Sequence, residues 1–245
     1  MLNIPELYLV NRKIALRTIL SGDLKPAEKK RLKSCLKGVT LTHQIKGESI
    51  PSFVDEAYRY EVILFLDVTL SDIKKAESMA PVFQKLFKPP CVIFFHDDNR
   101  ACLSFADKRI NPQNDQDIVI LETVVTPPQS LENFNNLETL MGKVMDFNAI
   151  MNTSHKRGFY LEVMTKAFIA GHSALYSKIL DFIDTPIWYY LHEVVLLLKC
   201  LDELRRLNEK KKKVVEIKDK VALNQQTRVI MDKLQSKLDM YAKAL

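Results

Sequence analysis

The sequence lacks the segments that would anchor it in a membrane or stabilise it with disulfides. Its longest apolar runs, such as Val62–Leu66 and Val194–Leu198, fall far short of the roughly 18 to 20 residues needed to cross a bilayer. The four cysteines include no C-x-x-C pair, which argues against a disulfide framework and against a zinc knuckle. The chain does not open with the basic segment followed by an apolar segment that is typical of a secretory signal. We therefore expect a cytoplasmic protein with reduced thiols and no membrane contact.

Motifs for common enzyme chemistry are also missing. No G-x-x-x-x-G-K-[ST] or G-x-G-x-x-G offers a loop for phosphates, and no H-E-x-x-H offers paired zinc ligands. No G-x-S-x-G marks a nucleophilic serine, and the five histidines have no metal-ligand spacing. We expect no cofactor, and the working hypothesis is that the chain is not an enzyme.

Proline and glycine disappear from the last quarter of the chain. Gly171 is the last glycine and Pro186 the last proline, so 59 residues follow without a helix breaker. Thr185 and Pro186 supply an N-cap followed by proline at the first helical position. We expect a helix to begin there, and residues 186–245 to form a long helix, a helical hairpin turning near Asn208, or a short coiled coil.

What the chain does contain is typical of a globular protein. Of its 245 residues 47% are hydrophobic and 27% charged, enough apolar material for one or two cores. The formal charge of +6 belongs to the C-terminal segment, since residues 187–245 hold 13 Lys and Arg against 8 Asp and Glu. Residues 1–186 hold 23 Lys and Arg against 22 Asp and Glu.

Residues 1–128 are expected to form an α+β domain. The element order, helix, strand, strand, helix and three strands (α-β-β-α-β-β-β), favours a mostly antiparallel sheet packed against helices. The predicted elements are a basic helix at 24–38, strands at 39–45 and 58–70, a helix capped by Ser71–Asp72 and ended by Pro89–Pro90, a β-hairpin of 91–96 with 101–106, and a strand at 118–125.

Residues 129–245 are expected to be all helical. The hydrophobic period changes from two to 3.6 after Pro128, and residues 131–145 predict one amphipathic helix. A second helix is predicted around Phe159, Val163 and Ala167 and closed by Gly171, and a third around residues 175–182. The short helices of 129–185 then lead into the long helical segment of 186–245.

A few acidic residues and one histidine could belong to a metal site. The carboxylates and the imidazole of the turn His96-Asp97-Asp98 stand at a strand end, as ligands of a divalent metal do in nucleases. Glu61, Asp67 and Asp107-Lys108 could imitate the carboxylates and the carboxylate-x-Lys pair of a restriction-type nuclease. The alternative is that residues 97–100 form a solvated turn, which Asp and Asn favour for backbone reasons alone.

Two other groups of residues are candidates for surface interactions. Basic residues for nucleic-acid backbone contacts are Lys29, Lys30, Arg31, Lys33, Lys210, Lys211, Lys212 and Lys213. The alternative for these is a solvated helix face. Apolar residues for a partner interface are Trp188, Leu197, Leu201, Leu204, Val221, Ile230 and Leu234. The alternative, for the stretch from Trp188 to Leu204 above all, is that these residues fold back on the chain's own body.

The run Lys30–Ile45 resembles the start of an uncharacterised prokaryotic family, domain of unknown function 4391. That family has a charged helix followed by Ile-Thr-Trp-x-Tyr-Lys-Leu, and residues 39–45 keep its hydrophobic phase without its two aromatics. Glu61–Leu66 resembles its second strand, Leu86–Phe95 its proline-marked entry into the next strand, and Ile217–Asn224 its Lys-rich tail. Residues 131–185 match least.

The resemblance suggests the kind of complex in which the protein acts, but it identifies no catalytic residue. Members of the family look like neighbours of helicase, DNA-methyltransferase and restriction-type genes. We therefore expect a non-catalytic accessory subunit of a DNA-processing or anti-phage defence complex, which docks a protein partner and can contact nucleic acid. The alternatives are a metal-dependent nuclease that uses Glu61, Asp67, His96 or Asp97, and a structural homo-oligomer formed through the C-terminal helices.

Overall fold

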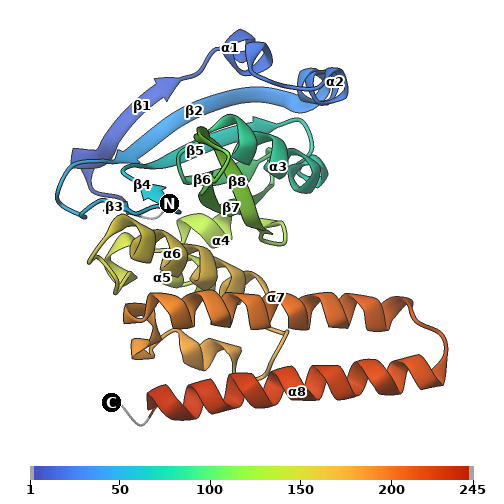
Figure 1. Ribbon diagram of the computed structural model, residues 1–245. Coiled ribbons are helices and arrows are strands. Elements are labelled where there is room, and N and C mark those ends of the chain that lie inside the picture. The colour runs from blue at the N-terminus through green and yellow to red at the C-terminus, as the bar shows by residue number, and fades with distance from the viewer. Residues whose placement is uncertain (1–2, 243–245) are drawn as a thin grey trace. The chain divides into compact units, whose positions relative to one another are not determined.

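A computed structural model describes residues 3–242 of the chain (Figure 1). The chain forms two compact units, one that ends at Gly171 and one that begins at His172. The first contains the sheet and the second is helical, which confirms the predicted α+β class with helices at the C-terminal end. Within residues 3–242, no helix is both long and apolar enough to cross a membrane.

The first unit is built on one sheet with the strand order β1-β2-β5-β6-β7-β8, and the short β9 also pairs with β7. Every pairing is antiparallel except that of β5 with β6, as the predicted mostly antiparallel sheet requires. The strands are β1 (Leu9–Lys13), β2 (Leu36–Ile45), β5 (Ile63–Leu70), β6 (Cys91–His96), β7 (Arg100–Asn111), β8 (Asn114–Val125) and β9 (Gln129–Ser130). A separate hairpin joins β3 (Phe53–Val54) to β4 (Arg59–Tyr60).

Strands β5 and β6 run parallel because a helical crossover connects them. It consists of the 3-10 helix η2 (Ile73–Lys75) and the helix α3 (Ala76–Leu86). The carboxylate of Asp72 accepts a hydrogen bond from the backbone N–H of Lys74, which confirms the predicted cap. Pro81 lies within α3 and does not end it. The predicted β-hairpin of β6 and β7 is also present.

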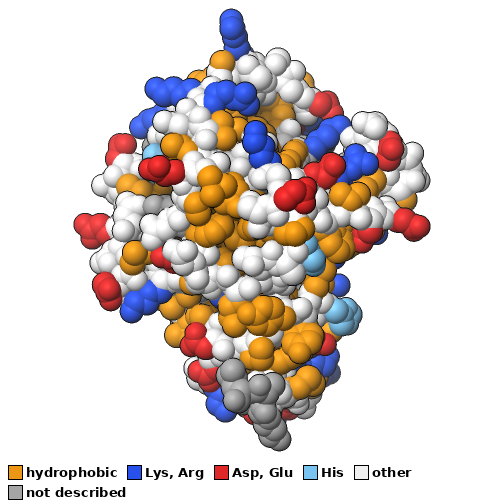
Figure 2. All heavy atoms as spheres, turned by 90° about the vertical axis from the view of Figure 1, so that its left-hand side faces the viewer, with side chains coloured by type: hydrophobic (Ala, Val, Ile, Leu, Met, Phe, Trp, Pro, Cys, Tyr) orange, Lys and Arg blue, Asp and Glu red, His pale blue; other side chains and the backbone are white. Residues whose placement is uncertain are grey.

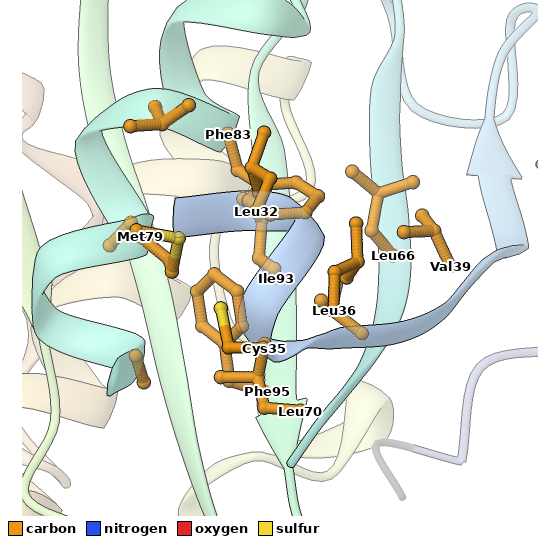
Figure 3. Packing of buried hydrophobic residues seen from close by; sticks show 14 of the residues in the cluster. Leu32, Cys35, Leu36, Val39, Leu66, Leu70, Met79, Phe83, Ile93 and Phe95 are labelled. Atoms are coloured by element: carbon orange, nitrogen blue, oxygen red, sulfur yellow. The ribbon is translucent and has the colours of Figure 1, made fainter. Parts of the chain in front are cut away.

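One face of the sheet carries the main hydrophobic core. Alternate residues of β2, β5 and β6 point to this face, where α1 (Leu16–Ser21), α2 (Pro26–Cys35) and α3 cover them. Figure 3 shows Leu32 and Cys35 of α2 packed among Met79 and Phe83 of α3 and Phe95 of β6. Helix α2 is therefore fixed on the sheet through its apolar side.

The other face of the sheet packs against α6 (Lys156–Gly171). The hydroxyl of Tyr160 accepts a hydrogen bond from Ala106 N–H in β7 and donates one to the carbonyl of Cys91 in β6, both at 2.9 Å. Helix α6 matches the predicted second helix, including its end at Gly171. Because it binds the sheet in this way, the first unit extends to Gly171, past the boundary expected at residue 128.

The single amphipathic helix predicted for residues 131–145 is divided in the structure into α4 (Glu132–Asn135) and α5 (Leu140–Val144). The hydroxyl of Thr139 caps α5 by accepting a hydrogen bond from Gly142 N–H. A Cβ at Gly142 would stand 2.0 Å from the carbonyl oxygen of Asn136, so the chain can turn this tightly only with glycine there. The 3-10 helices η1 (Glu6–Tyr8) and η3 (Phe147–Ala149) complete the unit.

The second unit is dominated by a helical hairpin of α7 (Leu191–Lys213) and α8 (Ile217–Ala242), two segments that pack side by side. This is one of the three forms expected for residues 186–245. The turn comes at residues 214–216, after the four lysines, and not near Asn208. Pro186 begins a short 3-10 helix, η5 (Pro186–Tyr189), so the α-helix itself starts five residues later than predicted. The 3-10 helix η4 (Ile179–Phe182) stands where the third short helix was expected.

Candidate functional site

Asp67 and His96, two of the predicted candidates, are brought together by the parallel strands β5 and β6. In this pairing Asp67 lies opposite Phe94, and Thr69 lies opposite His96. All four side chains point to the face of the sheet away from the core of α2 and α3. Nε2 of His96 is 3.1 Å from Oδ1 of Asp67 and 3.3 Å from Oγ1 of Thr69, and the pair is partly exposed.

Both ring nitrogens of His96 have hydrogen-bond partners. Nδ1 lies 3.2 Å from the backbone oxygen of Asp97, and a carbonyl oxygen can only accept a hydrogen bond. Nε2 faces the carboxylate of Asp67, which also accepts. The arrangement fits the doubly protonated imidazolium, and the hydrogen bond to Asp67 raises the pKa of His96 despite partial burial, which lowers it. An imidazolium held in this way supplies no free nitrogen for a metal or for a general base.

The carboxylate of Asp97 is occupied by the backbone. Its oxygens accept hydrogen bonds from the N–H groups of Asn99 and Arg100 in the β6–β7 turn and of Ile73 at the start of η2. Slight burial favours the neutral acid, but these three backbone donors prevail and lower the pKa of Asp97. Asp97 therefore links the β6–β7 turn to η2 by hydrogen bonds. This agrees with the alternative that residues 97–100 form a turn.

The remaining nuclease candidates do not join Asp67. Asp107 is buried and accepts a hydrogen bond from the hydroxyl of Tyr60, and Nζ of Lys108 donates to the backbone oxygens of Phe87 and Pro89. Glu61 is exposed and lines an open pocket of about 200 Å³. Its Oε2 lies 4.0 Å from Nε of Arg59. In the described part of the chain, no group of three or more His, Cys, Asp and Glu side chains could hold a metal ion.

Four predicted basic residues lie on the exposed part of α2, with Lys30 and Lys33 on the side away from the core and Lys29 and Arg31 on its two flanks. Leu32 and Cys35 are buried on one side of this helix, and Lys30 and Lys33, also three residues apart, are exposed on the opposite side. Arg31 is exposed and Lys29 partly exposed beside them. We call these four residues, Lys29, Lys30, Arg31 and Lys33, the α2 basic face. Figure 2 shows several Lys and Arg side chains at the top of the first unit, the part of that unit where Figure 1 places α1.

The local sequence explains why the α2 basic face has little opposing charge. Glu28 is the only acidic residue of the helix. It lies in the first turn, where its carboxylate accepts a hydrogen bond from the backbone N–H of Lys25 at 2.7 Å. Pro26 stands at the first helical position, so the start of the helix is fixed by these two residues. The cations of the following turns are left to face solvent.

The second basic run, Lys210 to Lys213, forms the last turn of α7. Four successive residues of an α-helix point in directions about 100° apart, so these lysines surround the helix instead of sharing one face. Lys211 is partly buried and the other three are exposed. The location is one where cations also stabilise the end of the helix through its dipole.

Six of the seven residues predicted for a partner interface are buried within the described structure. They are Trp188, Leu197, Leu201, Leu204, Ile230 and Leu234, all at most 3% exposed. Residues from α7 and α8 contribute to this set because the two helices pack on each other. The structure therefore agrees with the alternative, in which these residues pack against the chain itself. Only Val221, which is half exposed, remains accessible.

The sequence interpretation missed two features of these sites. One is Thr69, whose Oγ1 lies 3.3 Å from Nε2 of His96, because no local pattern connects it to a residue 27 positions later. The exposed residues Val215 and Ile217 were not among the predicted interface residues. The charged residues Lys210–Lys213 and Glu216, which interrupt the apolar residues of this segment, were the signal that these positions lie at a turn.

Comparisons with known proteins are consistent with the sequence resemblance. The family model described as "Domain of unknown function (DUF4391)" matches residues 2–234 of the 245-residue chain, which confirms the predicted family. Neither the comparison with curated proteins nor that with solved structures found a match.

Proposed function

This chain belongs to the DUF4391 family, and we propose that it acts as a non-catalytic accessory subunit of a DNA-processing or anti-phage defence complex. The family description itself carries no activity. The resemblance implies the setting, because family members look like neighbours of helicase, DNA-methyltransferase and restriction-type genes. In this proposal the subunit contacts the nucleic-acid backbone through the α2 basic face and docks onto a protein partner.

The observation that carries the proposal is the α2 basic face. Its four cations lie on a helix that Leu32 and Cys35 fix to the sheet, so they are presented by a rigid support. Lys30 and Lys33 are one turn apart, a spacing at which both ammonium groups can reach the same backbone strand. Contacts of this kind give affinity without sequence preference and weaken as salt rises.

The metal-dependent nuclease is the weaker candidate. It requires carboxylates and a nucleophile-activating metal at one point. Asp97 uses its carboxylate for backbone N–H groups, Glu61 stands at a separate pocket, and His96 has both ring nitrogens engaged. The homo-oligomer formed through the C-terminal helices is likewise weakened, since the apolar residues that would form it are buried between α7 and α8 and their surroundings.

Fluorescence anisotropy with a labelled DNA duplex of about three helical turns tests the nucleic-acid contact. We expect the variant with Lys29, Lys30, Arg31 and Lys33 all changed to Gln to bind at least about tenfold more weakly at ~100 mM salt. A matched control changes four exposed lysines of α7 and α8 to Gln, namely Lys199, Lys218, Lys220 and Lys233. Equal weakening in both variants, or none in either, would overturn the assignment to α2.

Membership of a complex is tested by affinity purification of the tagged chain from its native host. The purification is carried out at low and high salt with nuclease treatment and is followed by mass spectrometry. The proposal predicts a helicase, methyltransferase or restriction-type subunit that stays bound after nuclease. Recovery of nucleic acid alone, released at high salt, would contradict the accessory role and point to a free-standing nucleic-acid binder.

A further inference from the structure

The turn between α7 and α8 holds the two most exposed large hydrophobic residues described in the helical hairpin. We define the hairpin tip as residues 210–221. Val215 is 86% exposed, Ile217 80% and Val221 50%. By contrast Leu207, three residues before the tip, is 6% exposed. Leu207 is therefore packed within the hairpin, whereas Val215, Ile217 and Val221 of the tip face solvent.

Exposed apolar side chains that form a contiguous patch often mark an interaction surface. At the tip the exposed apolar residues occupy the connecting segment and the first two turns of α8, where Val215 and Ile217 are two positions apart and Val221 follows one turn after Ile217. A turn that served only to reverse the chain would be expected to carry Gly, Asn, Asp or Ser. Residues 214–216 are instead Val, Val and Glu.

The tip is also strongly basic. Residues 210–221 contain six lysines, Lys210 to Lys213 with Lys218 and Lys220, against Glu216 and Asp219. The net charge of +4 is concentrated around the apolar residues. A surface of this kind is complementary to a ligand that combines carboxylates with apolar side chains.

We propose that the hairpin tip binds an acidic, amphipathic segment of a partner protein. Apolar side chains of that segment pack on Val215, Ile217 and Val221, and its carboxylates face the surrounding lysines. The inference rests on the proposed accessory role in that it names a protein as the occupant. It assigns partner docking to exposed residues of the tip and not to the buried residues of α7 and α8. The docking surface is also distinct from the α2 basic face.

Charge and composition disfavour the other occupants. A second copy of the same tip would set +4 against +4, so like charges would repel. A nucleic-acid backbone offers no apolar surface for Val215 and Ile217. An anionic lipid surface is usually met by aromatic or leucine side chains, and residues 210–221 contain neither.

Three fluorescent peptides of about 16 residues, or about four helical turns, test the proposal by anisotropy. One has Leu at helical spacing among Glu, a second has the same Leu pattern among Lys, and a third has Glu with Ser replacing Leu. We expect only the Glu/Leu peptide to bind the full chain. The triple variant Val215→Ser, Ile217→Ser and Val221→Ser should weaken that binding about tenfold or more. Changing Lys210–Lys213 to Gln should weaken it and make it less sensitive to salt.

The matched control changes two exposed apolar residues elsewhere on α8, Val229→Ser and Met240→Ser, and should bind like the original chain. All substituted positions are exposed or part-exposed, so every variant should keep the thermal unfolding midpoint. Equal binding by the tip variant and this control would overturn the proposal. So would binding of the Lys/Leu peptide as tight as that of the Glu/Leu peptide, or tip-dependent binding to anionic vesicles.

The two proposals can fail separately. If the account holds, the α2 variant shows weakened binding to DNA and unchanged binding to the Glu/Leu peptide, and the tip variant shows the reverse. If the α2 variant also failed to bind the Glu/Leu peptide, the separation of the two surfaces would be contradicted. If the original chain binds the Glu/Leu peptide but does not bind DNA, this result would support the tip and contradict the proposed nucleic-acid contact.

Discussion

Nε2 of His96 lies 3.1 Å from Oδ1 of Asp67, although the two residues are 29 positions apart. The parallel register of β5 and β6 brings them to the same face of the sheet. Asp67 stabilises the protonated ring, so the pKa of His96 is raised in the folded chain. The carboxylate is about one third exposed, so solvent screens the pair, and we expect it to contribute less than about 1 kcal/mol.

The pair makes stability depend on pH in a defined direction. Because the folded-state pKa of His96 is raised, its contribution is complete below the unfolded value of about 6.5 and is lost as pH rises through the folded value. Urea unfolding should therefore show a larger difference between the original chain and Asp67→Asn near pH 6 than near pH 9. NMR titration showing that His96 keeps its ordinary pKa in the original chain would contradict this prediction.

A buried ion pair on α6 should be essential to the first unit. The carboxylate of Glu162 accepts hydrogen bonds from the backbone N–H groups of Met151 and Asn152 and lies 2.6 Å from Nζ of Lys166. Removing one partner leaves the other charge buried, so Glu162→Ala should cost about 3 to 5 kcal/mol of unfolding free energy. Glu138→Ala, at an exposed position, serves as the control in chemical denaturation. A cost as small as that of the control would show that the pair is not needed.

The apolar residues of α7 and α8 should behave as core residues. Leu201 is fully buried, and Leu201→Ala should destabilise the chain by about 2 to 5 kcal/mol, because the smaller side chain packs less well and leaves a cavity. Val229→Ala, on the exposed side of α8, should stay within about 0.5 kcal/mol. Denaturant unfolding measures both. If Leu201→Ala were as mild as Val229→Ala, the burial of this residue would be contradicted and a partner interface would again be the better interpretation.

The four thiols should differ in reactivity. Burial raises the pKa of Cys102 to about 12, and Cys35 and Cys91 are also buried with raised pKa values caused first by burial. Cys200 is only partly buried. A thiol-reactive chromogen at pH 8 should modify Cys200 first, and the other three only after unfolding. Cys200→Ser should abolish the early phase, and an early phase that survives this substitution would contradict the burial pattern.

The regular parts of the fold could be predicted from the sequence because their signals are local. The alternation in β2, the apolar centre of β5 and the closing Gly171 of α6 each report burial through a short period or a single residue. Strand β1 has no such signal, since all five of its residues are exposed at the edge of the sheet. The break between α4 and α5 depends on the close approach of Gly142 to Asn136, which periodicity does not record.

The candidate sites show the same division. The α2 basic face could be predicted, because charge on one short helix is visible in sequence. The pairing of Asp67 and His96 could not, because it depends on the register of two parallel strands joined by a crossover. The engagement of Asp97 by three backbone N–H groups instead of a metal depends on the geometry of the turn. Apolar residues of α7 could be identified, but their burial depends on how α7 and α8 pack.

The salt dependence of DNA binding tests the central claim most directly. The slope of the logarithm of the association constant against the logarithm of salt concentration counts the phosphates that the chain neutralises. We predict that changing Lys29, Lys30, Arg31 and Lys33 to Gln makes this slope shallower by about 0.9 for each phosphate that is no longer neutralised, while the four-lysine control on α7 and α8 leaves it unchanged. An unchanged slope in the α2 variant would contradict the claim that this face contacts the nucleic-acid backbone.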